Sequence, residues 1–145
     1  MSDWLYPLSA ASGRYFVESA GFVYPDTSFD SFEAMIRQGA TDDWWSLSTN
    51  YRKVNKGDRV WCYYGVAGGD RGVVGLAIAR AIEHDEPAGV HNVHLGWRLG
   101  ATRRLLKTPV PAARVREFVP SPRRAVQALS PHPELVEDLE KAAGL

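Results

Sequence analysis

The sequence predicts a single α+β domain, in which a curved, barrel-like mixed β-sheet is flanked by α-helices. Segments with the alternating pattern of β-strands concentrate in the middle of the chain, and apolar residues at helical spacing lie towards both ends. The chain has 145 residues, enough to bury one core, and shows no repeat, low-complexity tract or obvious linker. We therefore assign residues 1–145 to one domain.

The first elements are a strand and a helix. Trp4–Leu8 reads as a short strand that leads into a loop at Ser9–Gly13. Residues 28–39 are predicted to be helical because aromatic and aliphatic residues recur there at helical spacing, namely Phe29, Phe32 and Ile36. Gly39 stands where a left-handed residue would end this helix.

The middle of the chain predicts four strands, at Trp44–Thr49, Arg59–Tyr64, Gly72–Ile82 and Val93–Leu99. In the second, Val60, Cys62 and Tyr64 alternate with Trp61 and Tyr63. The glycine-rich segment Gly68–Gly72 predicts a hairpin turn into the third strand. That strand starts apolar on both faces, so we expect it to be central in the sheet.

The C-terminal third predicts two helices. Pro109 and Pro111 break the chain, and Ser121 before Pro122 resembles an N-cap that would start a short helix through Leu129. Ser130 and Pro131 interrupt that helix. A last helix is expected over Pro133–Ala143, with Leu135, Leu139 and Ala142 on one face and Gly144 after its end.

Composition excludes several classes of protein. The sequence shows no basic leader and no apolar run near the roughly 20 residues that span a bilayer, so we expect a cytoplasmic protein with no membrane partner. Cys62 is the only cysteine, and His91 and His94 would point to opposite faces of a strand, so no metal site or cofactor is expected. No catalytic motif is present, and we predict that the protein is not an enzyme.

Basic residues gather in two blocks although the net charge is zero. Residues 51–71 carry five basic and two acidic side chains, and residues 98–124 carry eight basic and one acidic. The two blocks would build one positive face if the fold brings them together, and otherwise they belong to an ordinary mixed surface. As phosphate contacts we expect Arg52, Lys53, Lys56, Arg103 and Arg104, with Arg98 and Lys107 as further candidates.

Aromatic residues are frequent, and some of them could form a binding surface for a base. The chain has five tryptophans, six tyrosines and five phenylalanines, many of them in or beside the predicted strands. An exposed aromatic plane can stack on any base, whereas a buried one is ordinary core. Asn50 offers an amide that could read one edge of a base, although asparagine is also common in turns.

The segment Trp45–Asp85 resembles the EVE family of the PUA-like superfamily, which is related to the YTH readers of methylated bases. The similar features are Trp45, the pair Asn50-Tyr51, the pair Gly57-Asp58, Tyr63 and the strand Gly72–Ala77. His91–Trp97 resembles the later strand that ends with a cage tryptophan in YTH-type relatives. Two features depart from the family pattern: a short loop between Asn50 and Gly57, and an insertion at Ser9–Asp43.

The resemblance implies a PUA-like fold and a nucleic-acid-binding module that captures a base, expected to be a modified one, in an aromatic pocket. Residues expected to line that pocket are Trp44, Trp45, Asn50, Tyr63 and Trp97. Gly57 and Asp58 are expected to form a structural turn. Two alternatives remain open, a PUA-like enzyme acting on RNA or a modified nucleoside, and a protein-interaction domain. The sequence distinguishes neither DNA from RNA nor one oligomeric state from another.

Overall fold

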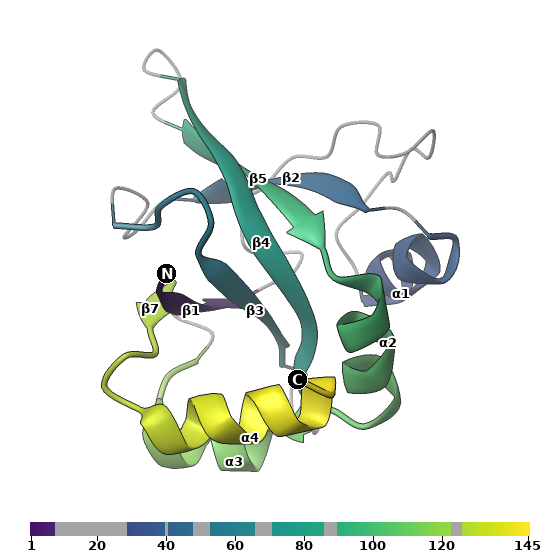
Figure 1. The fold of residues 1–145 in the computed structure, drawn as a ribbon, viewed down its shortest axis with the longest axis vertical. Helices are drawn as coiled ribbons and strands as arrows, with labels where there is room; N and C mark the ends of the chain where they lie inside the picture. Colours follow the sequence, from purple (N-terminus) through teal and green to yellow (C-terminus); the bar gives the residue numbers. More distant parts are fainter. Residues whose placement is uncertain (8–28, 40, 48–52, 66–70, 86–89, 123–125) are drawn as a thin grey trace.

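The computed structural model shows a β-sheet with helices packed on both of its faces (Figure 1). It describes residues 1–7, 29–39, 41–47, 53–65, 71–85, 90–122 and 126–145. Within these ranges, only the backbone is described for residues 31, 42–47, 83–85 and 90–92.

The sheet is mixed and open. Its strands are β1 (Asp3–Pro7), β2 (Asp42–Leu47), β3 (Arg59–Tyr64), β4 (Gly72–Asp85), β5 (Val90–Trp97), β6 (Val110–Pro111) and β7 (Gln127–Ala128). Their order is β2-β5-β4-β3-β1-β7, and β6 pairs with β4. Only β1 and β3 are parallel among the described pairs. The prediction of an α+β fold with a mixed sheet is confirmed, and β4 is central as expected, but the ends of the sheet do not close into a barrel within the described residues.

Two of the four helices match the prediction. The helices are α1 (Phe29–Arg37), α2 (Leu99–Lys107), α3 (Ala112–Phe118) and α4 (Pro133–Ala143). Residues after α1 and α4 take the expected left-handed conformation, with φ of 86° at Gly39 and 78° at Gly144. The sequence analysis did not predict α2 and α3, and it extended the strand now called β5 to Leu99, where α2 begins.

The predicted helix that runs through Leu129 is wrong. Residues 127 and 128 instead form β7, in which Gln127 pairs with Leu5 and Ala128 with Trp4. The backbone N–H of Leu129 also donates to the carbonyl of Asp3 at 2.9 Å. Pairing with the free edge of β1 thus overrides the local capping pattern, because it satisfies the backbone groups of both segments.

Side chains on the two faces of the sheet form separate cores. On one face Val60, Cys62 and Tyr64 of β3 pack with α1. On the other, Trp61 and Tyr63 pack with residues of α2, α3 and α4. The predicted alternation in β3 is therefore confirmed, as is the buried position of Cys62, and both faces of the sheet are occupied by helices.

Gly57 and Asp58 form a structural turn before β3, as expected. Gly57 has φ of 95°, a conformation that favours glycine, and its N–H donates to the carbonyl of Ala79 at 2.7 Å. The buried carboxylate of Asp58 accepts hydrogen bonds from the backbone N–H groups of Ser2 and Asn55 and from Nε1 of Trp4. These bonds fix the position of β1 beside β3.

Candidate functional site

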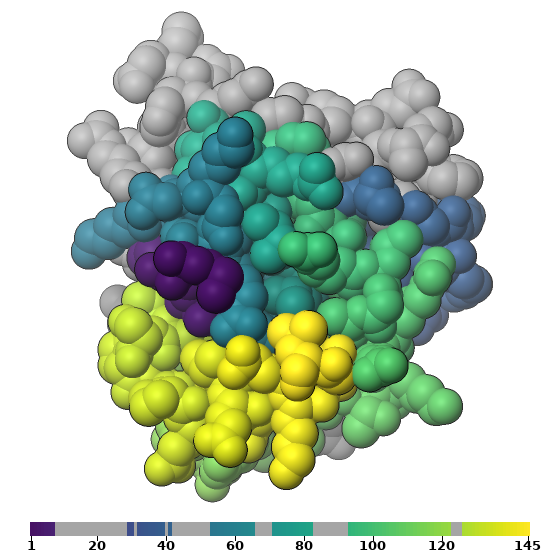
Figure 2. Space-filling view, in the orientation of Figure 1, coloured from purple at the N-terminus to yellow at the C-terminus, as the bar shows by residue number. Residues whose placement is uncertain are grey.

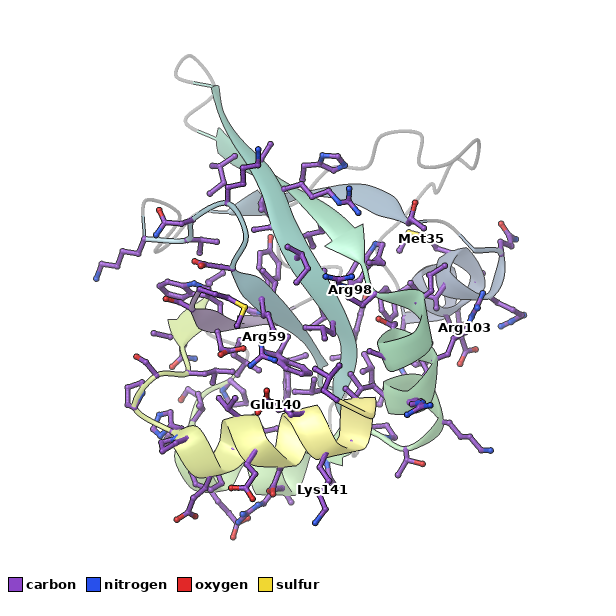
Figure 3. All side chains as sticks on the ribbon, viewed as in Figure 1. Met35, Arg59, Arg98, Arg103, Glu140 and Lys141 are labelled. Atoms are coloured by element: carbon purple, nitrogen blue, oxygen red, sulfur yellow. The ribbon has the colours of Figure 1, made fainter. Side chains whose placement is uncertain are left out.

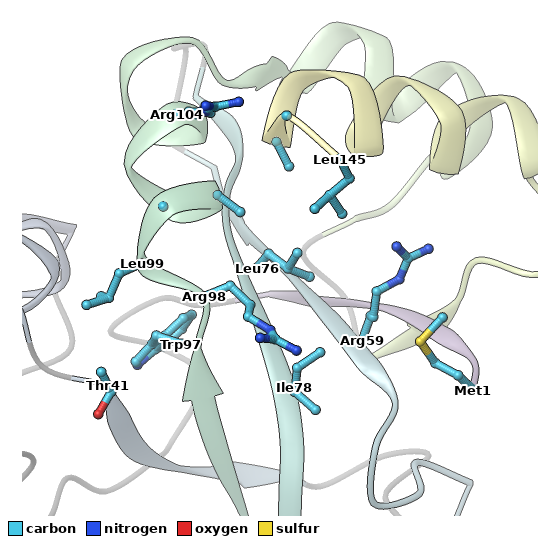
Figure 4. Close-up of a pocket in the computed structure, with 14 residues that line it drawn as sticks. Met1, Thr41, Arg59, Leu76, Ile78, Trp97, Arg98, Leu99, Arg104 and Leu145 are labelled. Carbon is cyan, nitrogen blue, oxygen red and sulfur yellow. The ribbon is translucent and has the colours of Figure 1, made fainter.

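A cavity of about 790 Å³ lies between the middle of β4, the end of β5, the start of α2 and the end of α4 (Figure 4). We call it the main cavity. Leu76 and Ile78 of β4 line it near its centre, and of the two Ile78 is half-buried whereas Leu76 is almost fully buried. In the space-filling view the N-terminal residues, the central strands, α2 and the end of α4 meet on one face of the molecule (Figure 2). Segments from both ends of the sequence and from its middle therefore enclose one site.

Three arginines line the main cavity, and they differ in how they are paired. Arg59 donates from Nε to Asp3 at 2.6 Å and from Nη1 to Glu140 at 2.9 Å, and Figure 3 shows it facing Glu140. Burial alone would lower the pKa of Arg59, but its bonds to Asp3 and Glu140 outweigh that effect and raise the pKa. Two carboxylates thus already neutralise this guanidinium, which joins β3 to β1 and α4.

The other two arginines, Arg98 and Arg104, have exposed side chains and form no ion pair with any described residue. Arg104 lies against Gly144, where a Cβ would collide with its guanidinium. None of the described residues lining the main cavity is Asp or Glu. Among the described side chains that line the cavity, the charges not neutralised by an ion pair are therefore positive and come from α2 and its N-cap residue.

A second cavity of about 440 Å³ adjoins the main cavity and shares Ile78 and Arg98 with it. Its other lining residues include Lys56 and Arg80. The guanidinium of Arg80 lies over Gly96, where any larger residue would collide with it. We call the two cavities together the basic groove, since cationic side chains from the turn before β3, from β4 and from α2 line it.

Trp97 carries a buried donor in the core on the face of the sheet that packs against α1. Its side chain is 3% exposed, it lines the cavity next to Thr41, and its ring packs against Phe32 with centroids 5.1 Å apart. Nε1 of Trp97 is buried and has no hydrogen-bond partner in the described structure. An indole N–H can only donate, and an unpaired buried donor costs about 1–3 kcal/mol.

The other two tryptophans whose side chains are described behave differently. Nε1 of Trp4 donates to Asp58 at 2.9 Å, and Nε1 of Trp61 donates to Asp3 at 2.8 Å. The fold thus supplies a carboxylate to each of these indoles. Trp97 is the exception among the three, and it is also the one that lines the main cavity.

Helix α2 starts at the same cavity without a cap. Arg98 occupies its N-cap position with no side-chain capping bond, and no acidic residue lies in its first turn. The first intrahelical bond runs from the N–H of Thr102 to the carbonyl of Arg98 at 2.8 Å. The N–H groups of Leu99, Gly100 and Ala101 precede it, at the positive end of the helix dipole, and all three residues line the cavity.

The predicted aromatic pocket is not assembled as expected. Tyr63 is 1% exposed and belongs to the core between the sheet and α3 and α4, whereas Trp97 belongs to the core on the opposite face. Tyr63 and Trp97 therefore lie in different cores, and Tyr63 is too deeply buried to offer an aromatic surface to a ligand. In the backbone, Trp44 pairs with His94 and Trp45 with Val93, but their side chains and all of Asn50 lie outside the described residues.

Only some of the residues predicted to contact phosphate line the basic groove. Lys56 and Arg104 line the basic groove, and Arg98 connects its two cavities. Arg103 instead donates to the carbonyl of Ile36 at 3.3 Å and so faces α1 (Figure 3). Lys53 and Lys107 are exposed but do not line the groove. Arg52 lies outside the described residues.

The sequence analysis missed the apolar surface and the helix start. Leu76 and Ile78 are alternate residues of β4, so their period could have shown a shared face. Leu99, Thr102, Leu105 and Leu106 follow helical spacing and could have indicated α2. No local pattern could have indicated that Arg80 lines the second cavity. Its guanidinium lies over Gly96, which β5 brings next to β4 only through long-range strand pairing.

Comparisons with known protein families, with curated proteins and with solved structures found no match. No group of three metal-ligating side chains occurs among the described residues. The described helices include none with the length and apolar character needed to cross a bilayer. The geometry of the basic groove is therefore the basis for a functional proposal.

Proposed function

We propose that this chain is a nucleic-acid-binding module that captures one nucleotide of DNA or RNA in the main cavity. The observation that carries this proposal is that one cavity is lined both by apolar side chains of β4, Leu76 and Ile78, and by Arg98 and Arg104, which form no ion pair with a described residue. A base presents flat apolar faces and its phosphate a negative charge, so the two halves of a nucleotide match the two kinds of surface.

The basic groove supports binding of a strand rather than of a small apolar ligand. It continues from the main cavity past Arg98 to Lys56, so neighbouring phosphates of one strand could follow it. Arg59 contributes little to this attraction because Asp3 and Glu140 neutralise it. The proposal therefore assigns phosphate contacts to Arg98, Arg104 and Lys56.

Recognition of a modified base is part of the proposal. A methyl group would add apolar contact against β4, and extruding a nucleotide would cost a few kcal/mol that these contacts offset. Trp44, Trp45 and Asn50 remain candidates for the further walls of the pocket, on the resemblance to PUA-like modified-base readers. Tyr63 is not among them, because it is buried in the other core.

Fluorescence anisotropy of labelled single-stranded DNA and RNA tests the proposal. Wild-type protein should bind with an affinity that falls steeply with salt, and Arg98→Gln should weaken binding about tenfold or more. Arg116→Gln is the matched control, since Arg116 is exposed on α3 and does not line the basic groove. The proposal is wrong if no oligonucleotide, with or without methylated bases, binds better to wild type than to Arg98→Gln.

A further inference from the structure

The two cavities of the basic groove meet at one arginine. The main cavity, of about 790 Å³, and the second cavity, of about 440 Å³, share Ile78 and Arg98 among their described lining residues. Both side chains are visible at this junction in Figure 4. Small-molecule sites in proteins have volumes of roughly 300–1,000 Å³, and both cavities fall in this range. A strand that leaves the main cavity past Arg98 therefore enters a second space large enough for another part of the ligand.

The backbone of Arg98 is fixed to β4, whereas its side chain is not paired. Its N–H donates to the carbonyl of Leu76 at 2.9 Å, and its carbonyl accepts the N–H of Thr102 at 2.8 Å. The buried hydroxyl of Thr102 donates to the same Leu76 carbonyl at 3.2 Å and accepts the Leu76 N–H at 3.1 Å. The Arg98 side chain is exposed and forms no ion pair with a described residue. The fold thus places an unneutralised planar cation between the two cavities before any ligand arrives.

We propose that the two cavities bind two consecutive nucleotides of a single strand, and that Arg98 binds the phosphate that links them. This inference rests on the proposed function and deepens it, because it makes a dinucleotide the smallest ligand that fills the site. One nucleoside occupies the main cavity, the next occupies the second cavity, and the phosphodiester lies at the junction beside Ile78.

The linking phosphate matches Arg98 better than it matches Lys56 or Arg104. A phosphodiester has two oxygens outside its ester bonds, and a planar guanidinium can donate to both of them at once. Lys56 lines only the second cavity, and Arg104 lines only the main cavity. These two cations therefore lie towards the outer phosphates, which a longer strand carries on either side of the two nucleotides.

The second cavity offers contacts for a nucleoside as well as positive charge. Ile78 supplies a half-buried apolar side chain, and Arg80 supplies a planar guanidinium, a group on which bases can stack. The Arg80 guanidinium lies over Gly96, where a Cβ would collide with it, so the absence of a side chain at Gly96 gives it room. No Asp or Glu occurs among the described residues that line this cavity, so none of them repels a phosphate.

The test compares dinucleotides with matched esters of single nucleotides. The oligonucleotide that binds wild type best in the anisotropy experiment defines the probes, and each dinucleoside monophosphate that it contains is titrated by calorimetry. The controls are the 3′- and 5′-methyl phosphate esters of the two nucleosides, which keep the phosphodiester and its charge but lack the second nucleoside. We expect at least one dinucleotide to bind about tenfold or more tightly than its esters. Its ¹⁵N–¹H spectrum should show shifts at Lys56 and Gly57 together with shifts at Leu99 and Gly100.

Substitutions locate the linking phosphate. A dinucleoside monophosphate carries a single phosphate, so Arg98→Gln should weaken its binding about tenfold or more. Lys56→Gln and Arg104→Gln remove the same charge from the same groove and should weaken it about threefold or less, an effect that should grow when phosphates are added at both ends of the dinucleotide. Arg116→Gln should leave every affinity unchanged, since Arg116 does not line the groove.

Three results would overturn the two-nucleotide site. They are dinucleotides that bind no more tightly than their esters, amide shifts confined to one of the two cavities, and equal weakening by the Arg98, Lys56 and Arg104 variants. If Arg98→Gln fails to fold, its amide spectrum shows this directly, and Arg98→Lys replaces it: lysine keeps the charge but loses the planar fork, so the dinucleotide should still bind less tightly than to wild type.

Failure of this inference differs from failure of the proposed function. Oligonucleotide binding that depends on Arg98, with no dinucleotide that exceeds its esters, would refute the two-nucleotide site and leave nucleic-acid binding intact. If no oligonucleotide binds better to wild type than to Arg98→Gln, the proposed function itself is wrong, and the two-nucleotide site is wrong with it.

Discussion

Asp58 accepts a hydrogen bond from the indole Nε1 of Trp4 at 2.9 Å, across 54 positions of sequence. The same carboxylate accepts the backbone N–H groups of Ser2 at 2.9 Å and Asn55 at 2.8 Å. One buried side chain therefore joins β1 to the turn before β3. Since Lys56 and Gly57 of that turn line the basic groove, Asp58 positions part of the candidate site without entering it.

Replacing Asp58 by asparagine should lower the free energy of unfolding by about 2–4 kcal/mol. The amide keeps the shape of the carboxylate but turns one acceptor into a donor, so at least one of the three N–H groups loses its partner. Denaturant unfolding monitored by tryptophan fluorescence measures the change. The control is Asp30→Asn, since Asp30 is exposed in the first turn of α1, and it should cost less than about 1 kcal/mol. Equal effects of the two substitutions would contradict the role of Asp58.

The stabilising effect of Asp58 should disappear in acid. Burial alone would raise the pKa of Asp58, but hydrogen bonds from Asn55, Ser2 and Trp4 outweigh it and lower the pKa. A carboxyl whose pKa is lower in the folded state contributes its full stability above the unfolded pKa of about 3.9 and loses it as pH falls through the folded pKa. The difference in unfolding free energy between wild type and Asp58→Asn should thus be constant near neutral pH and shrink below about pH 4. A difference that grows in acid has the wrong sign for this account.

Substitutions of Arg59 and Arg98 should differ in their effect on folding stability, although both residues line the main cavity. Arg59→Met leaves Asp3, whose side chain is 15% exposed, without its ion pair and should cost about 2–4 kcal/mol of folding free energy. Arg98→Met removes an exposed cation that forms no ion pair with a described residue, and should change stability by less than about 1 kcal/mol. Thermal melting of the two variants side by side checks this. A loss as large for Arg98→Met as for Arg59→Met would show that Arg98 is a structural residue.

Two tryptophan-to-phenylalanine changes should have unequal costs. Trp61→Phe reduces the volume that fills the core and also removes the hydrogen bond that Nε1 of Trp61 donates to Asp3. It should therefore lower the free energy of unfolding by about 2–4 kcal/mol. Trp97→Phe removes a donor that has no described partner, which offsets much of the reduced packing, and its cost should be smaller by about 1 kcal/mol or more. Chemical unfolding of both variants provides the comparison. If Trp97→Phe proves the more damaging change, its indole N–H is not unpaired in the folded protein.

The salt dependence of nucleic-acid binding should report the phosphate contacts. For single strands, the log–log slope of affinity against salt should become shallower by about 0.7 for each phosphate contact that a substitution removes. Lys56→Gln and Arg98→Gln should each reduce the slope by that amount, and the double variant by about twice as much. Arg116→Gln and Arg103→Gln should leave the slope unchanged, the latter because Arg103 faces Ile36. Anisotropy titrations at several salt concentrations measure these slopes. Identical slopes for all variants would show that the basic groove does not contact the phosphates.

Elements defined by local pattern were predictable from the sequence. The alternation of Arg59–Tyr64 and the spacing and stop residue of Pro133–Ala143 specify β3 and α4 with the observed bounds. Residues 127–128 show the opposite case, since a capping pattern predicted a helix and tertiary pairing with β1 made a strand. The start of α2 directly after β5 was hidden because Leu99 fits both the strand alternation and the helical spacing.

The candidate site was less predictable because its geometry depends on pairing over long distances. Aromatic content pointed to Tyr63, but helices cover both faces of β3, so its side chains are buried on either face, and no local pattern encodes those helix layers. The charge blocks did indicate Lys56, Arg98 and Arg104, since a positive groove needs cations from several segments. They could not show that Arg103 faces α1 or that Asp3 and Glu140 neutralise Arg59.

The most direct test of the central claim is to map amide chemical-shift changes on the ¹⁵N-labelled chain as a short single-stranded oligonucleotide is added. We predict that the largest changes occur at Leu76, Ile78 and Arg98–Ala101, with smaller ones at Lys56 and Gly57, and that α3 is unaffected. Changes centred on α3, or on a separate cavity of about 300 Å³ that Val110 and Lys141 line, would place the nucleic acid elsewhere and contradict the account.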